Sequence, residues 1–493
     1  MSATVEVVTP NASSPPPSAG VVPTIARKEL TELLRDARLK WAGGLIALLM
    51  LTALLLGWQQ QEQLDAERAA ARSETYQQWL GQGEKNPHSA AHFGQYAFKP
   101  ASPLSFLDPG INPYVGATVW MEAHKQNEFR FRPARDATSL RRFGDLSISF
   151  VWQVLSPLLI VLLTFNAFSG ERERGTLRQL LSVGVRPSQL LAGKLLALGA
   201  LLAMLLIPPI LLGTLLLLVI DDHHLSAVDT LGRSGLMLAG YAIYLGGFAL
   251  LALAVSALCG SSRKALIVLL AFWVANAFVA PRAITDLAAR LAPTPSALDF
   301  QAALTKAKRA NFGHDESHPA FIEFRDSVLK QYGVTRIEDL PVNFRALSLN
   351  EDDERGYRIY DEHYGRLWAI YQEQERIRAL GGVLFPLTAL QPWSMAMAGT
   401  DIAQQNHFAA AAEQYRRGIQ KAMAGDMIKN RPNDGSDYVA GPELWSSIKP
   451  FEYTPPSAAD VVPGQLSSLL ILLIWAAAAA GLAVTAVRRL QPT

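Results

Sequence analysis

Cysteine is nearly absent from the sequence. Cys259 is the only cysteine among 493 residues, which excludes an internal disulfide and a metal site made of several cysteines. The formal net charge is only +2. Because the chain has no basic excess, we expect no nucleic acid as a partner. Residues 1–22 lack the basic stretch and apolar run of a signal peptide. Their proline and serine content predicts a disordered tail.

Charged residues are missing from six long apolar runs. A helix that crosses a bilayer needs about 20 apolar residues, and each run is close to that length. The predicted spans are 41–58, 147–168, 195–220, 235–259, 265–281 and 465–487. Pro208 and Pro209 lie in the middle of the third span, where the missing backbone donors predict a kink.

Lysine and arginine are unevenly distributed among the short segments that flank these spans. They are frequent in residues 23–40, 169–194 and 488–493, and they form the pair at 263–264. The short loop between the third and fourth spans, 221–234, holds one arginine and three aspartates. Because basic flanks stay in the cytoplasm, we expect both termini and residues 169–194 to be cytoplasmic.

Two long segments, 59–146 and 282–464, then lie on the opposite side of the membrane. The second has apolar residues at helical spacing, whereas the first is rich in turn residues. The apolar stretch around Pro386 and Pro392 is predicted as an interfacial or core segment, not a seventh span. The fold class is therefore an all-α polytopic membrane protein with six transmembrane helices. Both of its termini are cytoplasmic, and its two insertions form one large, mostly helical extracytoplasmic domain.

Residues 169–194 form an unusually long connection between the second and third spans. Glu171 and Glu173 come first, where carboxylates favour the start of a helix. Leu177, Leu180 and Leu181 follow on one helical face, and "GVRP" ends the helix. This amphipathic helix needs a cover for its apolar face, which is either the lipid interface or another protein.

The stretch "GERERGTLRQLLSVGVRPSQLLAGKLLA" resembles the signature of ABC-2-type transporter permeases. In that family the segment is a coupling helix that docks into a groove of a cytosolic ATPase. The resemblance implies an ATPase-coupling role for nine residues: Glu171, Arg172, Glu173, Arg174, Gly175, Thr176, Leu177, Leu180 and Leu181. Residues 23–40 are likewise similar to the amphipathic elbow helix of the family.

The two insertions resemble those of a subgroup of bacterial permeases with a DUF3526-type extracytoplasmic domain. Residues 86–110 and 386–401 carry this similarity. The resemblance implies a permease subunit in the bacterial inner (cytoplasmic) membrane, with its large domain in the periplasm. It also implies a second permease, as homodimer or heterodimer, contact with lipid, and an extracytoplasmic protein partner. ATP hydrolysis would drive either substrate export or mechanical transmission to the external domain.

The chain has no nucleotide-binding loop of its own. A Walker A loop needs glycine-rich backbone donors ahead of Lys and Ser or Thr. Gly193-Lys194 is followed by Leu195, and Ser188 stands where the first glycine should be. We therefore expect no catalytic residue and no cofactor in this chain. ATP and Mg²⁺ would be bound by a partner ATPase.

Two other classes of protein are alternatives to an ABC-2-type permease. A transporter driven by an ion gradient uses charged or histidine side chains inside the bilayer, and the six spans lack them. The second alternative is an ATPase-independent, membrane-anchored protein whose extracytoplasmic domain mediates interactions or binds metal.

Histidine clusters bear on that metal-binding alternative. The candidate ligands are His88 and His92 at i,i+4, then Asp222, His223 and His224, then His314 and His318. Pro87 and loop-like surroundings weaken the first pair, and a site needs a third or fourth ligand. Exposed or helix-capping histidines explain each cluster more simply, so no metal site is predicted.

Overall fold

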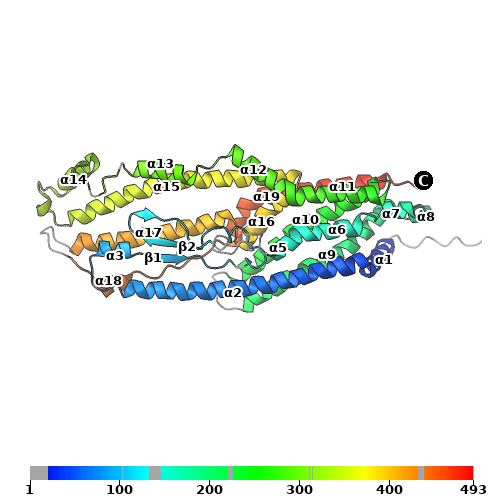
Figure 1. The fold of residues 1–493 in the computed structure, drawn as a ribbon, viewed down its shortest axis with the longest axis horizontal. Coiled ribbons are helices and arrows are strands. Elements are labelled where there is room, and N and C mark those ends of the chain that lie inside the picture. The colour runs from blue at the N-terminus through cyan, green and yellow to red at the C-terminus, as the bar shows by residue number, and fades with distance from the viewer. Residues whose placement is uncertain are drawn as a thin grey trace, which may run out of the picture.

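The molecule is elongated and consists of two parts that lie end to end. The computed structural model describes residues 20–102, 104–132, 146–219, 226–309, 311–313, 315–430 and 438–491. Six long apolar helices form a bundle at the end that holds the C-terminus, and mainly polar helices with a small sheet form the other end (Figure 1). We call these parts the apolar bundle and the polar half.

Six helical segments are long and apolar enough to cross a membrane. They are Leu39–Leu80, Ile148–Glu173, Pro187–Leu215, Ala227–Leu258, Ser262–Leu291 and Ala458–Arg488. Their elements are η2 (Leu39–Gly43), α2 (Gly44–Leu80), α5 (Ile148–Phe150), η4 (Val151–Leu155), α6 (Ser156–Thr164), α7 (Ser169–Glu173), α9 (Pro187–Val219), α10 (Ala227–Leu258), α11 (Ser262–Val274), η5 (Ala275–Val279), α12 (Ala280–Leu291) and α19 (Ala458–Arg488). The predicted six spans are confirmed as helices, and each lies within one of these segments or overlaps it.

The helices are longer than the apolar runs that predicted them. Helix α2 continues to Leu80, whereas the first predicted span ends at Trp58. Residues 59–80 are mostly Gln, Glu, Ala and Arg, which are strong helix formers. The helix therefore continues beyond the end of the apolar run. Helix α10 likewise begins at Ala227, inside the predicted loop 221–234. Helix α9 runs on through Pro208 and Pro209.

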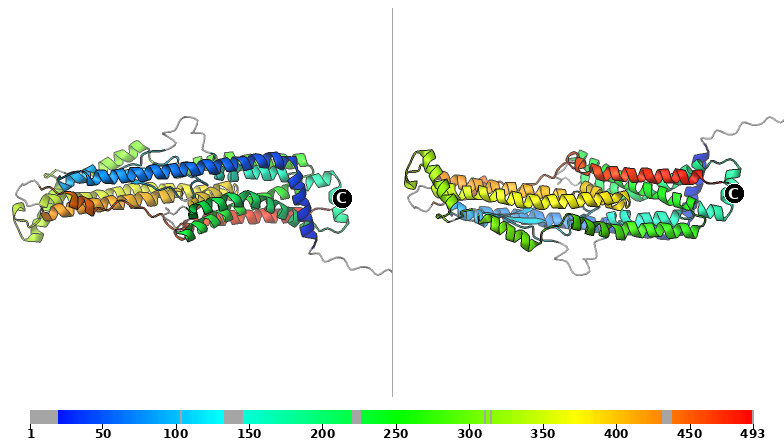
Figure 2. Two further views of the ribbon diagram at one scale, coloured as in Figure 1. Left: turned by 90° about the horizontal axis from the view of Figure 1, so that it is seen from below. Right: turned by 90° about the horizontal axis from the view of Figure 1, so that it is seen from above.

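Helix α1 (Val21–Arg35) corresponds to the predicted elbow helix. It lies across the end of the bundle, at a steep angle to α2 (Figure 2). The chain turns at Asp36, whose carboxylate binds the Arg38 guanidinium, and Arg38 also donates to the carbonyl of Leu162 at 2.8 Å. Of the predicted tail, residues 1–19 lie outside the described part of the chain.

The polar half is built from both insertions, as predicted. The helices are α3 (Pro87–Phe93), α13 (Ala297–Lys308), α14 (Pro319–Tyr332), η6 (Ile337–Asp339), α15 (Phe344–Leu380), α17 (Ile402–Asn430) and α18 (Pro442–Ser447). Trp79 of α2 joins the two insertions, since its indole donates to the carbonyl of Trp445 at 2.9 Å. Both tryptophans are fully buried.

A three-stranded antiparallel sheet, not predicted from the sequence, lies in the first insertion. Its strands are β1 (Gln95–Phe98), β2 (Thr118–Glu122) and β3 (Lys125–Gln126), in the order β1-β2-β3. Tyr96 faces Trp120 across the first pair of strands. These strands are too short to show a clear alternating pattern, and one face packs on α17 through Phe408.

Helix α16 (Leu387–Ala398) lies buried where the two parts of the molecule meet. It follows α15 through η7 (Gly381–Val383) and precedes α17. Its Trp393 donates to the carbonyl of Leu236 in α10 at 2.9 Å, and a Cβ atom on Gly240 would lie only 2.4 Å from that indole. The prediction of a core segment agrees with this position, and α16 is not among the six candidate spans.

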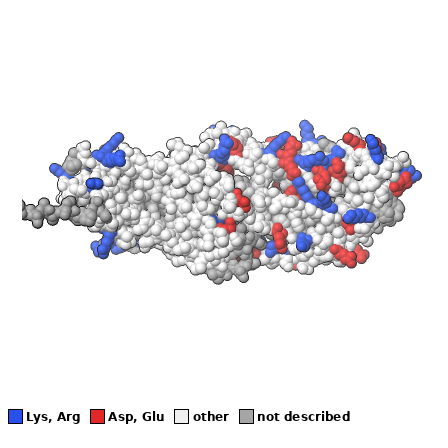
Figure 3. Space-filling view, turned by 180° about the vertical axis from the view of Figure 1, so that it is seen from behind, with Lys and Arg blue, Asp and Glu red and all other residues white. Residues whose placement is uncertain are grey.

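Charged side chains of the described residues are concentrated towards the two ends of the molecule, and the surface between them is largely uncharged, as expected for a membrane protein. Figure 3 shows Lys and Arg at one end of the molecule, a broad uncharged region next to them, and mixed charges over the other half. The uncharged region is the surface of the apolar bundle, where exposed leucines such as Leu48, Leu211 and Leu215 lie. A soluble protein does not leave so large an apolar surface uncovered, so this surface faces lipid.

Candidate coupling site

The segment with the ABC-2-like motif forms two short helices at the charged end of the bundle. Helix α7 (Ser169–Glu173) is followed by α8 (Thr176–Ser182), and Gly175 connects them with a φ of +75°. Glycine adopts this left-handed conformation without steric cost, which explains why the chain can turn sharply there. Residues 187–194 are the first turns of α9.

Glu171 points into the protein instead of toward a partner. Its carboxylate accepts a hydrogen bond from Lys194 of α9 at 2.7 Å, and both side chains are buried. The same ammonium contacts Glu29 of α1 at 2.9 Å. Burial raises the pKa of Glu29, but the charges and hydrogen bonds of Lys194 and Lys28 together outweigh it and hold that pKa below its ordinary value. The pair of carboxylates around Lys194 therefore ties α1, α7 and α9 together.

Arg172 and Glu173 hold the tight turn between α10 and α11. The Arg172 guanidinium donates to the carbonyls of Cys259 and Ala257 at 2.6 and 2.9 Å, at the end of α10. Glu173 accepts from the backbone N–H and the hydroxyl of Ser262, both at 2.8 Å, at the start of α11. A cation at a helix C-terminus and an anion at an N-terminus complement the helix dipoles. The charged motif is thus a set of links from α7 to four other helices.

The leucine stripe is covered by the chain itself. Leu177 is buried, and Leu180 and Leu181 are half-buried against the same cluster. The cluster includes Leu190 of α9 and Ala486 of α19. The expectation that lipid or another protein covers this face is therefore wrong in this structure, because the ends of α9, α10 and α19 provide the cover.

The exposed side of the segment is basic with one apolar residue at its tip. We call this the outward face: Arg174, Arg178, Gln179, Ser182, Val183 and Arg186. The Val183 side chain is 77% exposed. Of the nine coupling residues predicted from the resemblance, Arg174 and Gly175 are exposed on this side, as is Glu173, which is bound to α11. Arg178, Gln179, Ser182, Val183 and Arg186 were not among the nine, although positions opposite a leucine stripe must face outward.

A chain of buried polar groups connects α16 to the bundle. Gln153 donates to the Tyr241 hydroxyl at 2.9 Å, and that hydroxyl lies 2.9 Å from the Ser394 hydroxyl of α16. Ser394 in turn donates to the carboxylate of Asp108 at 2.5 Å. Burial raises the pKa of the Asp108 carboxyl group above its ordinary value, although its hydrogen bonds oppose that effect. These links fix α16 to the second and fourth spans.

Two π-helical turns place polar side chains in this region. Gln153 belongs to η4, and Asn276 belongs to η5. Asn276 donates to the Tyr244 hydroxyl at 3.0 Å and accepts from the backbone of Leu387 in α16 at 3.2 Å. An extra residue in a helical turn rotates the side chains that follow, so each turn can direct an amide toward α16.

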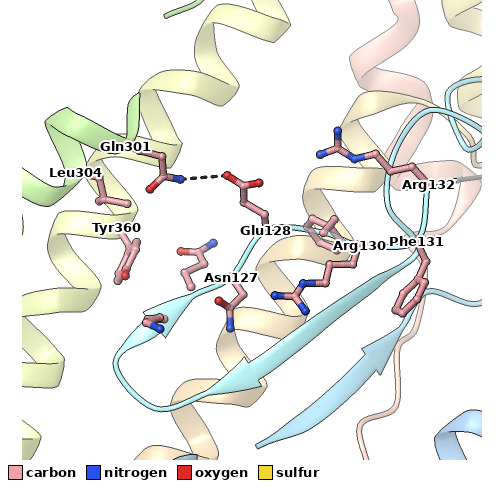
Figure 4. Close-up of a pocket in the computed structure, with 11 residues that line it drawn as sticks. Asn127, Glu128, Arg130, Phe131, Arg132, Gln301, Leu304 and Tyr360 are labelled. Carbon is pink, nitrogen blue, oxygen red and sulfur yellow. Dashed lines mark hydrogen bonds between the residues drawn. The ribbon is translucent and has the colours of Figure 1, made fainter. Parts of the chain in front are cut away.

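A cavity of about 750 Å³ lies in the polar half. It lies between the chain after β3 and helices α13 and α15 (Figure 4). Gln301 and Glu128 meet across it in a 3.1 Å hydrogen bond. Arg130 and Tyr360 also line it. These groups are polar, and Glu128 and Arg130 contribute opposite charges to the cavity wall.

The histidine candidates have different outcomes. His88 and His92 lie next to a third histidine, His124, which was not among the ligands predicted from the sequence. His318 caps α14, since its ring accepts from the backbone of Ala320 at 3.2 Å. Residues 222–224 and His314 lie outside the described residues.

Two family models match the chain. The model described as ABC-2 family transporter protein matches residues 23–344, and the domain of unknown function DUF3526 matches residues 297–454. The chain therefore belongs to the ABC-2 family of transporter membrane proteins, and it carries a DUF3526 domain. Both resemblances derived from the sequence are confirmed. No curated protein matches the chain.

Proposed function

We propose that this protein is the permease subunit of an ABC transporter and that a separate cytosolic ATPase docks on the outward face. The observation that carries the proposal is the set of links made by Glu171, Arg172 and Glu173. They connect α7 to α1, α9, α10 and α11, so a partner that moves α8 would move all four helices. The ATPase supplies the bound ATP and Mg²⁺.

The same links continue toward the polar half. Helix α10 holds α16 through Trp393 and through Arg233, whose guanidinium donates to the carbonyls of Ala396 and Met397 at 3.2 and 3.3 Å. Helix α16 lies between α15 and α17 in the chain. A displacement that begins at α8 would thus reach the polar half through α10. This movement would serve either substrate export or mechanical transmission to an extracytoplasmic protein partner.

The exposed apolar faces of the bundle are consistent with a dimer of permeases in a bacterial inner membrane. The spans Leu39–Leu80 and Ser262–Leu291 are the least covered, with 22% and 17% of their most apolar windows buried. These faces would contact lipid or a second permease, in a homodimer or a heterodimer. Basic residues cluster at the α8 end, which supports a cytoplasmic location for that end, and the polar half would then lie in the periplasm.

A docking variant tests the proposal directly. Arg178→Glu combined with Val183→Asp reverses the charge and removes the apolar tip of the outward face without touching the buried links. Tagged wild type and variant are purified from native cells in mild detergent, and the samples are assayed for ATP hydrolysis and for Walker-motif proteins by mass spectrometry. The ATPase is expected with the wild type and absent from the variant.

The matched control changes an exposed cation and an exposed valine in the polar half. Lys330→Glu combined with Val439→Asp should keep the ATPase, because both residues are exposed far along the chain from α8. An ATPase that remains with the docking variant at the wild-type amount would contradict the proposal, as would a wild type without one.

A further inference from the structure

Three histidines converge in the polar half, away from the coupling site. His88 and His92 come from α3, and His124 comes from the loop between β2 and β3. Their ring centroids are 4.8 to 5.1 Å apart in all three pairs, so the rings form a nearly equilateral triangle. The ring nitrogens that could bind a metal all lie within 4.8 Å of one another.

Helix α3 places two of these rings on one face. Asn86 caps the helix by accepting from the backbone of His88 at 2.9 Å, and Pro87 occupies the first turn. Proline is favourable at that position because its missing N–H has no helical partner there anyway. Pro87 therefore helps to start the helix, and the expectation that it weakens the histidine pair is wrong. Residues at i and i+4 then lie side by side.

The separation of these two rings fits a tetrahedral metal ion. The Nε2 atoms of His88 and His92 are 3.3 Å apart. Zinc bound to histidine has Zn–N distances of about 2.0–2.1 Å, which places two nitrogens of a tetrahedron about 3.3–3.4 Å apart. Small rotations of the third ring would bring its nitrogen to a similar spacing.

His124 is held in place from both its backbone and its ring. Its carbonyl accepts from Lys308 of α13 at 3.2 Å and from the hydroxyl of Tyr360 in α15 at 3.4 Å. Its Nδ1 lies 2.7 Å from a carboxylate oxygen of Asp353, which is largely buried. A carboxylate on one ring nitrogen keeps the proton there and leaves the lone pair on the other nitrogen, as in many histidine–zinc sites.

We propose that His88, His92 and His124 bind one late first-row divalent cation, represented by Zn²⁺, with Asp353 as the positioning residue behind His124. Imidazole ligands suit Zn²⁺, Cu²⁺ and Ni²⁺ better than Mg²⁺ or Ca²⁺, which prefer oxygen ligands. His92 is exposed, so the ion can enter from solvent and keep a water molecule in the fourth position. The site goes beyond the proposed function, because it needs no ATPase.

The bound ion would fasten three segments of the polar half. Helix α3 and the β2–β3 loop provide the ligands, and Asp353 connects them to α15. Helix α15 leads through η7 to α16 and the bundle. Metal binding would therefore stiffen the region that the coupling movement has to reach.

Zinc titration of the full-length protein tests the site. The protein is purified in detergent with a tag that contains no histidine, stripped of metal with a chelator, and titrated with Zn²⁺ against a chromophoric chelator. We expect one Zn²⁺ per chain. The visible spectrum of the Co²⁺-substituted protein should show tetrahedral coordination, and Zn²⁺ should raise the thermal unfolding midpoint.

Variants separate the ligands from the positioning residue. His92→Ala and His124→Ala should each lower the Zn²⁺ affinity at least tenfold, and His92→Ala keeps the test valid if the other variant fails to fold, because His92 is exposed. Asp353→Asn should lower the affinity about 10–100-fold while one ion per chain still binds. His363→Ala is the control, since that ring lies outside the cluster, with its Nδ1 next to the carbonyl of Ile359 in its own helix and its edge against Phe300. A wild type that binds no Zn²⁺ at micromolar concentration would overturn the proposal, and so would a His92→Ala variant with wild-type affinity.

Discussion

Lys194 and Glu171 form an ion pair of 2.7 Å inside the charged end of the apolar bundle, where their side chains are only 4% and 7% exposed. Glu171 belongs to the motif that identifies the family, yet it is turned away from any partner. Its position suggests that part of the motif serves to hold the docking surface rather than to form it. The second carboxylate on Lys194, from Glu29, extends that support to the elbow helix.

Removal of Lys194 should destabilise the protein strongly. Lys194→Met leaves the buried carboxylate of Glu171 without its cation, while Glu29 keeps Lys28 at 3.0 Å. An uncompensated buried charge costs about 3–5 kcal/mol. The thermal unfolding midpoint in detergent should fall clearly. The double variant Lys194→Met with Glu171→Gln should recover part of the loss, because it removes the carboxylate that has lost its cation. A single variant as stable as the wild type would show that the pair is not buried in the folded protein.

Removal of Arg172 should uncouple the ATPase without releasing it. Arg172→Gln breaks the two hydrogen bonds to the end of α10 but leaves the outward face intact. Cys259 is the only cysteine and lies at this corner, so its rate of reaction with a maleimide reports on the movement of α10. In the wild type the rate should differ between ATP-bound and nucleotide-free states. In the variant this difference should shrink while the ATPase still co-purifies.

The opposite pattern would contradict this division of roles. If Arg172→Gln lost the ATPase, the residue would belong to the docking surface. If the labelling rate kept its full dependence on nucleotide, the contact with α10 would not transmit the movement. Arg263→Gln offers a control at the same corner, since Arg263 is exposed on α11.

The stability of the polar half should rise with pH above neutrality because of Lys99. Its ammonium is buried and donates to Asn112 at 3.1 Å and Gln405 at 2.9 Å. Burial lowers the pKa of Lys99 from 10.5 to about 8, Asp401 opposes this shift, and Arg68 adds to it. Between about pH 8 and 10.5 the unfolded chain holds a proton that the folded chain does not. The free energy of unfolding should therefore increase across that window, by about 3 kcal/mol in total.

Comparison with Lys99→Met isolates this effect from other alkaline titrations. The difference in unfolding midpoint between wild type and variant should change in favour of the wild type as the pH is raised from 8 to 10. Lys330→Met is the control, because Lys330 is exposed, and it should follow the wild type at every pH. A constant difference between wild type and Lys99→Met would show that the pKa of Lys99 is not depressed.

The sequence was sufficient to predict the spans and the place of the coupling segment, because hydropathy and charge act locally along the chain. The direction of each charged side chain in that segment could not be predicted. Glu171 and Glu173 are two residues apart, but one pairs with α9 and the other with α11. Such partners depend on how distant helices pack.

The histidine cluster could be predicted from the sequence only in part, for the same reason. The spacing of His88 and His92 is visible in the sequence, but His124 lies in a loop between two short strands that gave no clear pattern. Its partner Asp353 is far away along the chain. Only the packing of α15 against the β2–β3 loop brings a carboxylate, a loop and a helix together.

Arg233 should resist even a conservative replacement. The residue is buried and pairs with Asp229 at 2.7 Å, and it donates to the carbonyls of Ala396, Met397 and Pro456. A planar guanidinium can serve several acceptors at once, whereas an ammonium is a single compact charge. Arg233→Lys should thus remove a donor from at least one of these three carbonyls.

The lost bonds set the expected size of this effect. A hydrogen bond to a charged group contributes about 1.5–3 kcal/mol, so Arg233→Lys should lower the free energy of unfolding by at least that amount. The thermal midpoint in detergent measures it, with Arg358→Lys at an exposed position of α15 as the control. If the two variants unfold together at the wild-type temperature, α16 does not depend on Arg233, and the path from α10 to the polar half must run through other contacts such as Trp393 and the Tyr241–Ser394 hydrogen bond.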